Sequence, residues 1–254
     1  MFPMTDAAGM RLQVIVAHPD DETFGCGSLL LHARSAGAVT AVCCATRGES
    51  GEVADGVLLP PGGVGELREG ELRAAAGLLG VQRVDLLNFL DSGMAGEVGP
   101  DALGGAEASL VHADIGRAVD AFGPDVIVTL DGSDGHRDHA RVRDIAIEVA
   151  AERGVPTYLH CLPRSAMERW ANHMSQQHSD SVYLALGELG TPDEHISHVV
   201  DTSQFWQQRW AAIHAHRSQT SPFEGLPEDL ARAFLCREHL SLVQRPSTAG
   251  NRDT

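Results

Sequence analysis

The stretch Leu12–Glu22 constrains this chain more than any other, because an apolar run ends abruptly in a group of charged side chains. Leu12–Ala17 is short and rich in β-branched residues, which predicts a buried strand. His18 and Pro19 follow, and then three consecutive acids, Asp20–Glu22. A strand cannot bury three charges cheaply, and open α/β sheets bind ligands beyond the carboxyl ends of their strands. A polar loop whose acids cap the next helix is the alternative, but it accounts for only one or two of them.

Apolar strands and amphipathic helices alternate over the first 161 residues. We expect further strands at 39–45, 84–89, 124–130 and 157–161, and helices at 28–35, 66–79, 109–122 and 140–153. This alternation predicts an α/β fold with a Rossmann-like, mostly parallel sheet flanked by helices.

Beyond residue 164 the pattern becomes irregular. Residues 170–180 are polar, 181–187 and 196–200 look like short strands, and 202–216 looks helical. We therefore expect a Rossmann-like catalytic core at 10–164, a smaller irregular C-terminal cap region at 165–245 packed on it, and a disordered tail at 246–254.

Composition narrows the class of partner and the compartment. The formal charge of −16 argues against nucleic acid or an anionic membrane surface as a partner. No apolar run reaches the length of a membrane span, and the N-terminus lacks the pattern of a secretory signal. Five cysteines without Cys-x-x-Cys spacing indicate reduced thiols in a cytoplasmic protein. Oligomeric state is left open, and a homo-oligomer is compatible with the sequence.

A second polar cluster, His136–His139, directly follows the apolar strand expected at 124–130. Such a His-x-Asp-His segment is weak alone, but two clusters that each follow a buried strand predict a first-row metal site. Catalytic zinc takes three protein ligands from His and carboxylate and keeps one position open, and it lowers the pKa of bound water to about 7. A nearby carboxylate can take the proton of that water, and a His can serve the oxyanion or the leaving group.

The two clusters resemble the motifs of the LmbE-like, or PIG-L, family of zinc-dependent N-deacetylases. That family carries Ala-His-Pro-Asp-Asp-Glu after its first strand and Gly-His-Pro-Asp-His after a later one. Here they stand as Ala17–Glu22 and Gly135–His139, with Arg137 in the Pro position. The resemblance spans roughly residues 12–220 and includes Gly48–Val53, Arg68–Leu72, Asp91–Met94 and Ala215–Gln219. It is strongest with the actinobacterial branch that deacetylates the mycothiol precursor or cleaves mycothiol conjugates.

Residue by residue, the resemblance implies roles for both clusters. The implied zinc ligands are His18, Asp21 and His139, and the implied catalytic groups are Asp20, His136 and Asp138. Asp20 would be the general base. His136 would stabilise the oxyanion or protonate the amine, with Asp138 orienting it. Fe²⁺ or Co²⁺ would also suit a site of two His and one Asp.

Substrate-binding residues are expected on the loops around these clusters. Arg68 and Asp91 match positions that bind sugar hydroxyls in relatives, although Arg68 also reads as an exposed helix arginine. Glu49 either caps the Gly-rich loop or touches the substrate, and we favour the substrate.

Four further positions stand out. Some relatives place a Tyr two residues before the His of the second motif, where this chain has Asp134. His216 and Gln219 are either partners of site residues or partners of a helix C-terminus. Cys26 between two glycines reads as a small buried residue at a tight helix start rather than a nucleophile.

The function predicted from these residues is a zinc-dependent amide hydrolase acting on a small molecule. It would remove an acetyl or related acyl group from an N-acylated amino sugar or glycoconjugate. A mycothiol-S-conjugate-type amidase or a natural-product tailoring deacetylase would use the same site. A non-catalytic α/β protein that binds a sugar or a nucleotide is the alternative from another class, and the intact clusters argue against it.

Overall fold

The computed structural model describes residues 7–177 and 187–243, and a seven-stranded sheet forms its centre. The strands are β1 (Arg11–Val16), β2 (Val39–Thr46), β3 (Arg83–Phe89), β4 (Val126–Leu130), β5 (Thr157–His160), β6 (His198–Asp201) and β7 (Arg237–Leu242). Their order in the sheet is β3-β2-β1-β4-β5-β7-β6. β1 to β5 are parallel, whereas β7 runs antiparallel to both β5 and β6. The expected α/β fold with a mostly parallel sheet is confirmed.

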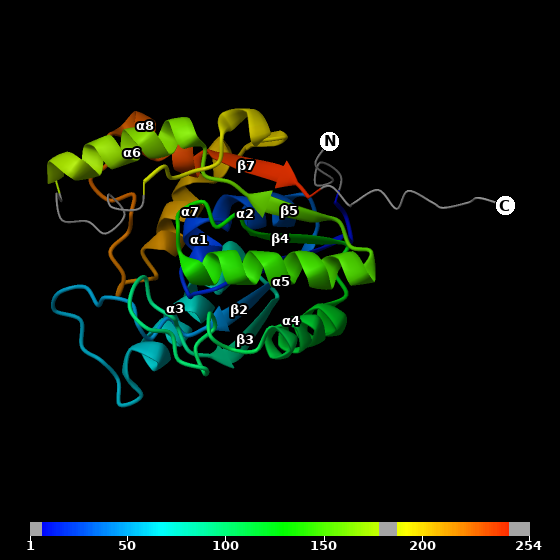
Figure 1. The fold of residues 1–254 in the computed structure, drawn as a ribbon. Coiled ribbons are helices and arrows are strands. Elements are labelled where there is room, and N and C mark those ends of the chain that lie inside the picture. The colour runs from blue at the N-terminus through cyan, green and yellow to red at the C-terminus, as the bar shows by residue number, and fades with distance from the viewer. Residues whose placement is uncertain (1–6, 178–186, 244–254) are drawn as a thin grey trace.

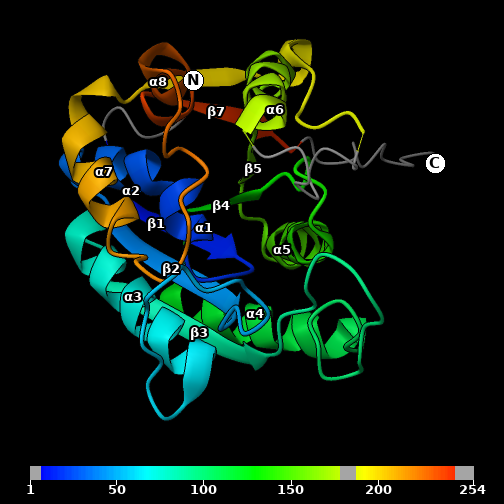
Figure 2. The same cartoon turned by 90° about the vertical axis from the view of Figure 1, so that its left-hand side faces the viewer.

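Helices cover both faces of the sheet (Figures 1 and 2). They are α1 (Asp21–Phe24), α2 (Gly27–Ser35), α3 (Gly63–Leu79), α4 (Ala108–Phe122), α5 (Arg137–Arg153), α6 (Arg164–Gln177), α7 (Trp206–Ile213) and α8 (Glu228–Leu235), with short 3₁₀ turns at Asp193–His195 and Ser203–Phe205. Figure 2 shows α2, α3 and α7 on one face of the sheet and α4 and α5 on the other.

The side chains of β1 alternate between the two cores that these helix layers create. Leu12, Val14 and Val16 belong to the core under α2 and α3, and Ile15 belongs to the core under α4 and α5. All four are at most 1% exposed. Each buried aliphatic side chain contributes about 1.5–3 kcal/mol. The strand that precedes the first acidic cluster is therefore firmly fixed.

The two polar clusters lie where the strand order reverses. From β1 the chain moves outward to β2 and β3, and then returns to β4 beside β1 before continuing to β5. Such a switch point leaves a crevice beyond the carboxyl ends of the two central strands. His18 follows β1 and His136 follows β4, so both clusters open into this crevice.

One boundary near the site differs from expectation. We expected a helix from residue 140, but α5 begins at Arg137 and the second cluster occupies its first turn. His136 caps this helix, because its ring nitrogen accepts a hydrogen bond from the backbone N–H of Asp138 at 3.1 Å. The negative charge of the Asp138 carboxylate is also stabilised by the positive end of the helix dipole at the N-terminus of α5.

The C-terminal region is more ordered than the irregular cap that we expected. α6 covers residues expected to be merely polar, and α8 and β7 were not predicted. Apolar side chains of α6 and α8, together with Phe223 and with Ile213 of α7, form a third core that includes Trp170 and Phe234. β6 and β7 also extend the central sheet. The strand expected at 181–187, apart from Gly187, and the tail at 246–254 lie outside the described residues; the division at residue 164 stays a prediction.

Two further findings concern membrane-spanning helices and the cysteines. No helix within residues 7–177 and 187–243 is both long and apolar enough to cross a membrane. All five cysteines are buried and free.

Candidate metal centre and active site

The first cluster is shaped by its proline. A residue before Pro is disfavoured in the helical region, so β1 cannot run directly into a helix at His18, and the chain bends at Ala17 and His18 instead. The residue after the proline, Asp20, adopts φ = 120°, the only positive φ of a non-glycine residue in the described part of the chain. The turn returns the Asp21 carboxylate to the backbone N–H of His18 at 2.8 Å.

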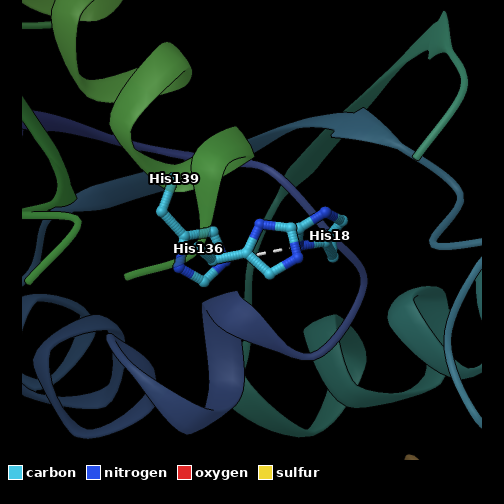
Figure 3. Close-up of side chains that lie close together, drawn as sticks. All are labelled: His18, His136 and His139. Atoms are coloured by element: carbon cyan, nitrogen blue, oxygen red, sulfur yellow. Dashed lines mark hydrogen bonds between the residues drawn. The ribbon is translucent and has the colours of Figure 1, made fainter. Parts of the chain in front are cut away.

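The three predicted metal ligands converge from two elements. His18 Nδ1 lies 3.2 Å from His139 Nε2. Asp21 lies between them, with Oδ2 3.5 Å from His18 Nδ1 and Oδ1 3.2 Å from His139 Nε2. All three side chains are at most 10% exposed. Figure 3 shows the His18 ring close to the rings of His136, which caps α5, and His139, which lies in its first turn.

These separations fit a small tetrahedral metal ion. Ligand atoms about 2.1 Å from such an ion are about 3.4 Å from one another. The outward nitrogens, His18 Nε2 and His139 Nδ1, each face a carboxylate, which favours placing the ring hydrogen there. The inward nitrogens, His18 Nδ1 and His139 Nε2, then carry lone pairs that face each other and the Asp21 carboxylate. Only a cation relieves this arrangement, so the residues present fit a divalent metal.

The pKa values of the two imidazoles point the same way. Burial alone would lower the pKa of His18, but Asp138 and Asp21 raise it well above its usual value. Burial likewise opposes protonation of His139, yet Asp21 and Asp134 raise its pKa to about 10. The cluster therefore attracts positive charge.

Other donor sets lie close by. His136 offers a ligand atom within 4.8 Å of those of His18 and His139, and so do Asp91 and Asp138 with His18. We favour His18, Asp21 and His139, because Asp91 and Asp138 contact the Nε2 of His18, on the far side of the ring.

The Asp138 carboxylate takes a different partner from the one predicted. Its Oδ2 lies 3.2 Å from His18 Nε2 and accepts the backbone N–H of Ser92 at 2.9 Å, and its Oδ1 has no hydrogen-bond partner. Only the Asp138 backbone N–H contacts the His136 ring. The carboxylate was expected to orient His136, but as the second residue of α5 it points across the crevice toward β1. Its contact is with the predicted ligand His18 instead.

His136 is suited to donate a hydrogen bond as a neutral imidazole. Burial, with the neighbouring His18 and His139, lowers its pKa to about 4. Because Nδ1 accepts from the Asp138 backbone, the ring hydrogen is placed on Nε2. His136 packs 4.8 Å from the His139 ring, centroid to centroid. Its predicted role with an oxyanion stays a prediction.

Asp20 is held by a buried arginine. Arg68 Nη2 donates to Asp20 Oδ2 at 2.9 Å and to the carbonyl of Pro19 at 2.5 Å, and Nη1 donates to the carbonyl of Gly48 at 2.8 Å. Gly48 has φ = 65°, and a Cβ there would collide with this guanidinium. Burial raises the pKa of Asp20 to about 6, although Arg68 opposes the shift. That value suits a general base near neutral pH.

The predicted substrate residues lie at the site but differ in their freedom to bind. Arg68 is only 3% exposed and its Nη1 and Nη2 donate to protein atoms, so it is not the exposed helix arginine of the alternative interpretation. Asp91 Oδ1 lies 3.4 Å from His18 Nε2. Glu49 accepts the Asp91 backbone N–H at 3.3 Å. Their contacts with substrate stay predictions.

Two side chains that support the site were not predicted to do so. The sequence interpretation gave Glu22 no role and left the role of His216 undecided. Glu22 accepts the backbone N–H of Asp20 at 3.0 Å and pairs with His216 Nε2 at 2.9 Å, and both side chains are fully buried. His216 therefore contacts the site through Glu22, and Gln219 donates to Ser218 Oγ at 3.0 Å. The signal was present, since a third acid in the first motif needs a partner once it is buried.

Arg209 of α7, 1% exposed, was also missed. It donates to the carbonyls of Thr23, Phe24 and Gly25 at 2.6–3.2 Å, which anchors the end of α1. Its Nη1 pairs with Glu238 of β7 at 2.8 Å. No local pattern marks an arginine as buried, because its partners lie far away in the chain.

Comparisons with known proteins agree with the resemblance seen in the sequence. Residues 13–150, more than half of the chain, match the family described as PIG-L, GlcNAc-PI de-N-acetylase. The 1D-myo-inositol 2-acetamido-2-deoxy-alpha-D-glucopyranoside deacetylase of Rhodococcus jostii is 30% identical over 276 residues, covering 96% of this chain and 94% of the relative. The protein of the same name from Geodermatophilus obscurus is 29% identical over 274 residues, covering 92% of each.

A solved structure shares the fold. A deacetylase of the teicoplanin biosynthesis pathway aligns with a TM-score of 0.66 at 20% identity, over 94% of this chain and 100% of the other.

Proposed function

The chain belongs to the PIG-L family of de-N-acetylases, and from this membership we propose that it hydrolyses the acetamide of an N-acetylated amino sugar. It is an enzyme of the amide-hydrolase class, and its family is metal-dependent. The relatives reported above, named for a 2-acetamido-2-deoxy-glucopyranoside of inositol, support a small acetylated amino sugar as substrate. A non-catalytic binding protein is disfavoured by this membership.

The observation that carries the proposal is the convergence of His18 Nδ1, the Asp21 carboxylate and His139 Nε2 within 3.2–3.5 Å. We propose that these three side chains hold the metal ion and that the ion is zinc. When bound, zinc supplies Lewis-acid chemistry, lowering the pKa of water to about 7 and polarising a carbonyl group.

The chain's own groups would move the protons. Asp20, with a pKa of about 6, accepts a proton from the attacking water and returns one to the departing amine. Arg68 fixes the Asp20 carboxylate while it does so. His136 donates its Nε2–H toward the amide oxygen as negative charge develops there. Asp138 keeps His18 oriented by accepting from Nε2.

The test measures bound metal and acetate release on the same samples. Wild-type protein reconstituted with Zn²⁺ should hold about one metal per chain and release acetate from N-acetylglucosaminyl-inositol. His139→Ala should lose both. His112→Ala, which removes a histidine of α4 paired with Glu152, should keep both.

Two results would contradict the proposal. One is wild-type protein that takes up no metal after reconstitution. The other is zinc-loaded protein that cleaves neither this substrate nor larger acetylated glycosides such as a glycopeptide antibiotic. Turnover of the larger glycoside alone would keep the amidase reaction and indicate the tailoring deacetylase.

A further inference from the structure

We propose that Asp134 is a positioning residue of the metal centre: its carboxylate holds His139 with the hydrogen on Nδ1, so that Nε2 is free to bind the metal. The inference rests on the proposed function only in taking His139 as a ligand.

The contact is short and largely sheltered from solvent. Asp134 Oδ2 lies 2.6 Å from His139 Nδ1, and the two side chains are 22% and 8% exposed. A neutral imidazole carries one ring hydrogen, and a carboxylate can only accept it. In the neutral imidazole that a metal requires, the hydrogen is thus placed on Nδ1, and Nε2, the nitrogen that faces His18 and Asp21, carries the lone pair.

Asp134 is itself held in place. Its second oxygen, Oδ1, accepts the backbone N–H of His136 at 3.1 Å. The loop bends back through Gly132 and Gly135, which have φ values of 70° and 84°, a conformation that favours glycine. A hydrogen bond from Gly135 N to the Gly132 carbonyl at 3.3 Å closes this turn. One carboxylate therefore connects the turn after β4 with the first turn of α5.

The other predicted histidine ligand has the same arrangement. His18 directs Nε2 toward the Asp138 carboxylate at 3.2 Å and Nδ1 toward the metal centre. Each imidazole thus has a carboxylate on its outward nitrogen. Such partners fix the ring orientation and increase the basicity of the ligating nitrogen, and their loss typically weakens metal affinity 10- to 100-fold.

The experiment measures zinc affinity without using catalysis. Metal-free full-length protein competes for Zn²⁺ with a chromophoric chelator, in wild type, Asp134→Ala and Asp134→Asn. We expect a 10- to 100-fold higher Kd for Asp134→Ala. Asp134→Asn should fall between, because an amide oxygen still accepts the hydrogen bond without the negative charge. Asp144→Asn, which removes an acid of α5 that is 61% exposed, should remain within twofold of wild type.

A Kd within twofold of wild type for both Asp134 variants overturns the inference. If circular dichroism shows that Asp134→Ala does not fold, the isosteric Asp134→Asn decides alone, with an unchanged Kd again counting against it. The outcome is separate from the proposed function. Wild-type protein that binds zinc but releases no acetate would refute the deacetylase and leave the comparison of affinities intact.

Discussion

Arg68 Nη2 bridges the Asp20 carboxylate, at 2.9 Å, and the carbonyl of Pro19, at 2.5 Å, so one guanidinium nitrogen holds both the predicted base and the peptide before it. From sequence, Arg68 reads as a sugar-binding residue. Its burial and its hydrogen bond to Asp20 lead us to predict that it mainly supports Asp20.

Substitution of Arg68 separates these two roles. Arg68→Met should lower kcat about 10- to 100-fold with little change in KM, because misplacing a catalytic group acts on the chemical step. Arg68→Lys should recover only part of the loss, since ammonium lacks the planar fork. Steady-state kinetics check this, with Arg73→Met on the exposed face of α3 as the control. A raised KM at constant kcat would instead assign Arg68 to the sugar.

Asp20→Asn tests the base directly. The amide cannot accept the proton of water, so kcat should fall about 10²- to 10⁴-fold. Zinc content should stay near that of wild type, because Asp20 is not among the three proposed ligands. Metal analysis and acetate release on one preparation measure both quantities. Undiminished turnover by the zinc-loaded variant would remove Asp20 from the role.

The positive φ of Asp20 predicts that glycine at this position is more stable than alanine, which reverses the usual order. At φ = 120° a side chain is strained by about 1–3 kcal/mol, and glycine is not. Asp20→Gly should therefore be more stable than Asp20→Ala by about 1 kcal/mol, despite the greater freedom of glycine in the unfolded chain. Urea unfolding of the metal-free variants measures this. As a control, Ala211→Gly in α7 should destabilise the protein by about 1 kcal/mol, because glycine is normally less stable than alanine within a helix. Equal stability of the two Asp20 variants would speak against the strain.

Glu238 predicts a loss of stability in acid. Burial alone would raise its pKa, but Arg209 of α7, His160 of β5 and the neighbouring His239 together lower it. A lowered carboxyl pKa stabilises the fold above the unfolded value of about 4.3, and this contribution disappears as pH falls through the folded value.

Glu238→Gln should thus cost about 3 kcal/mol at pH 7, because it leaves Arg209 buried without its counter-ion. The gap to wild type should narrow below about pH 4. Urea unfolding with chelator at pH 7, 5, 4 and 3 measures it, with the exposed Glu228→Gln as control. A gap that stays constant across this range would contradict the assigned shift.

The meeting of the two clusters could be predicted from sequence because topology decides it. His18 and His139 each follow an apolar strand, and parallel strands deliver their carboxyl ends to the same edge of a sheet. Neither the partner of Asp138 nor that of Asp134 could be predicted this way. The partner of Asp138 depends on where the first turn of α5 lies relative to β1. The partner of Asp134 depends on how the turn after β4 bends onto that first turn, and α5 begins three residues earlier than expected.

The C-terminal elements escaped prediction for a related reason. Glu238 of β7 is 0% exposed. An acid in a short apolar segment argues against a buried strand and for a loop, unless its buried partner, here Arg209, is known. α6 is polar apart from a narrow stripe that includes Met167 and Trp170. Their burial depends on tertiary contacts that no local window contains.

The anchoring of α1 by Arg209 also bears on how the protein is made. Arg209 and Thr23 are 186 residues apart, and Glu238 comes later still. A chain emerges from the ribosome N-terminus first, so the segment with His18 and Asp21 is synthesised long before its arginine and the strand that neutralises it. A nascent or C-terminally truncated chain would therefore carry the first motif without the Arg209 hydrogen bonds that anchor the end of α1.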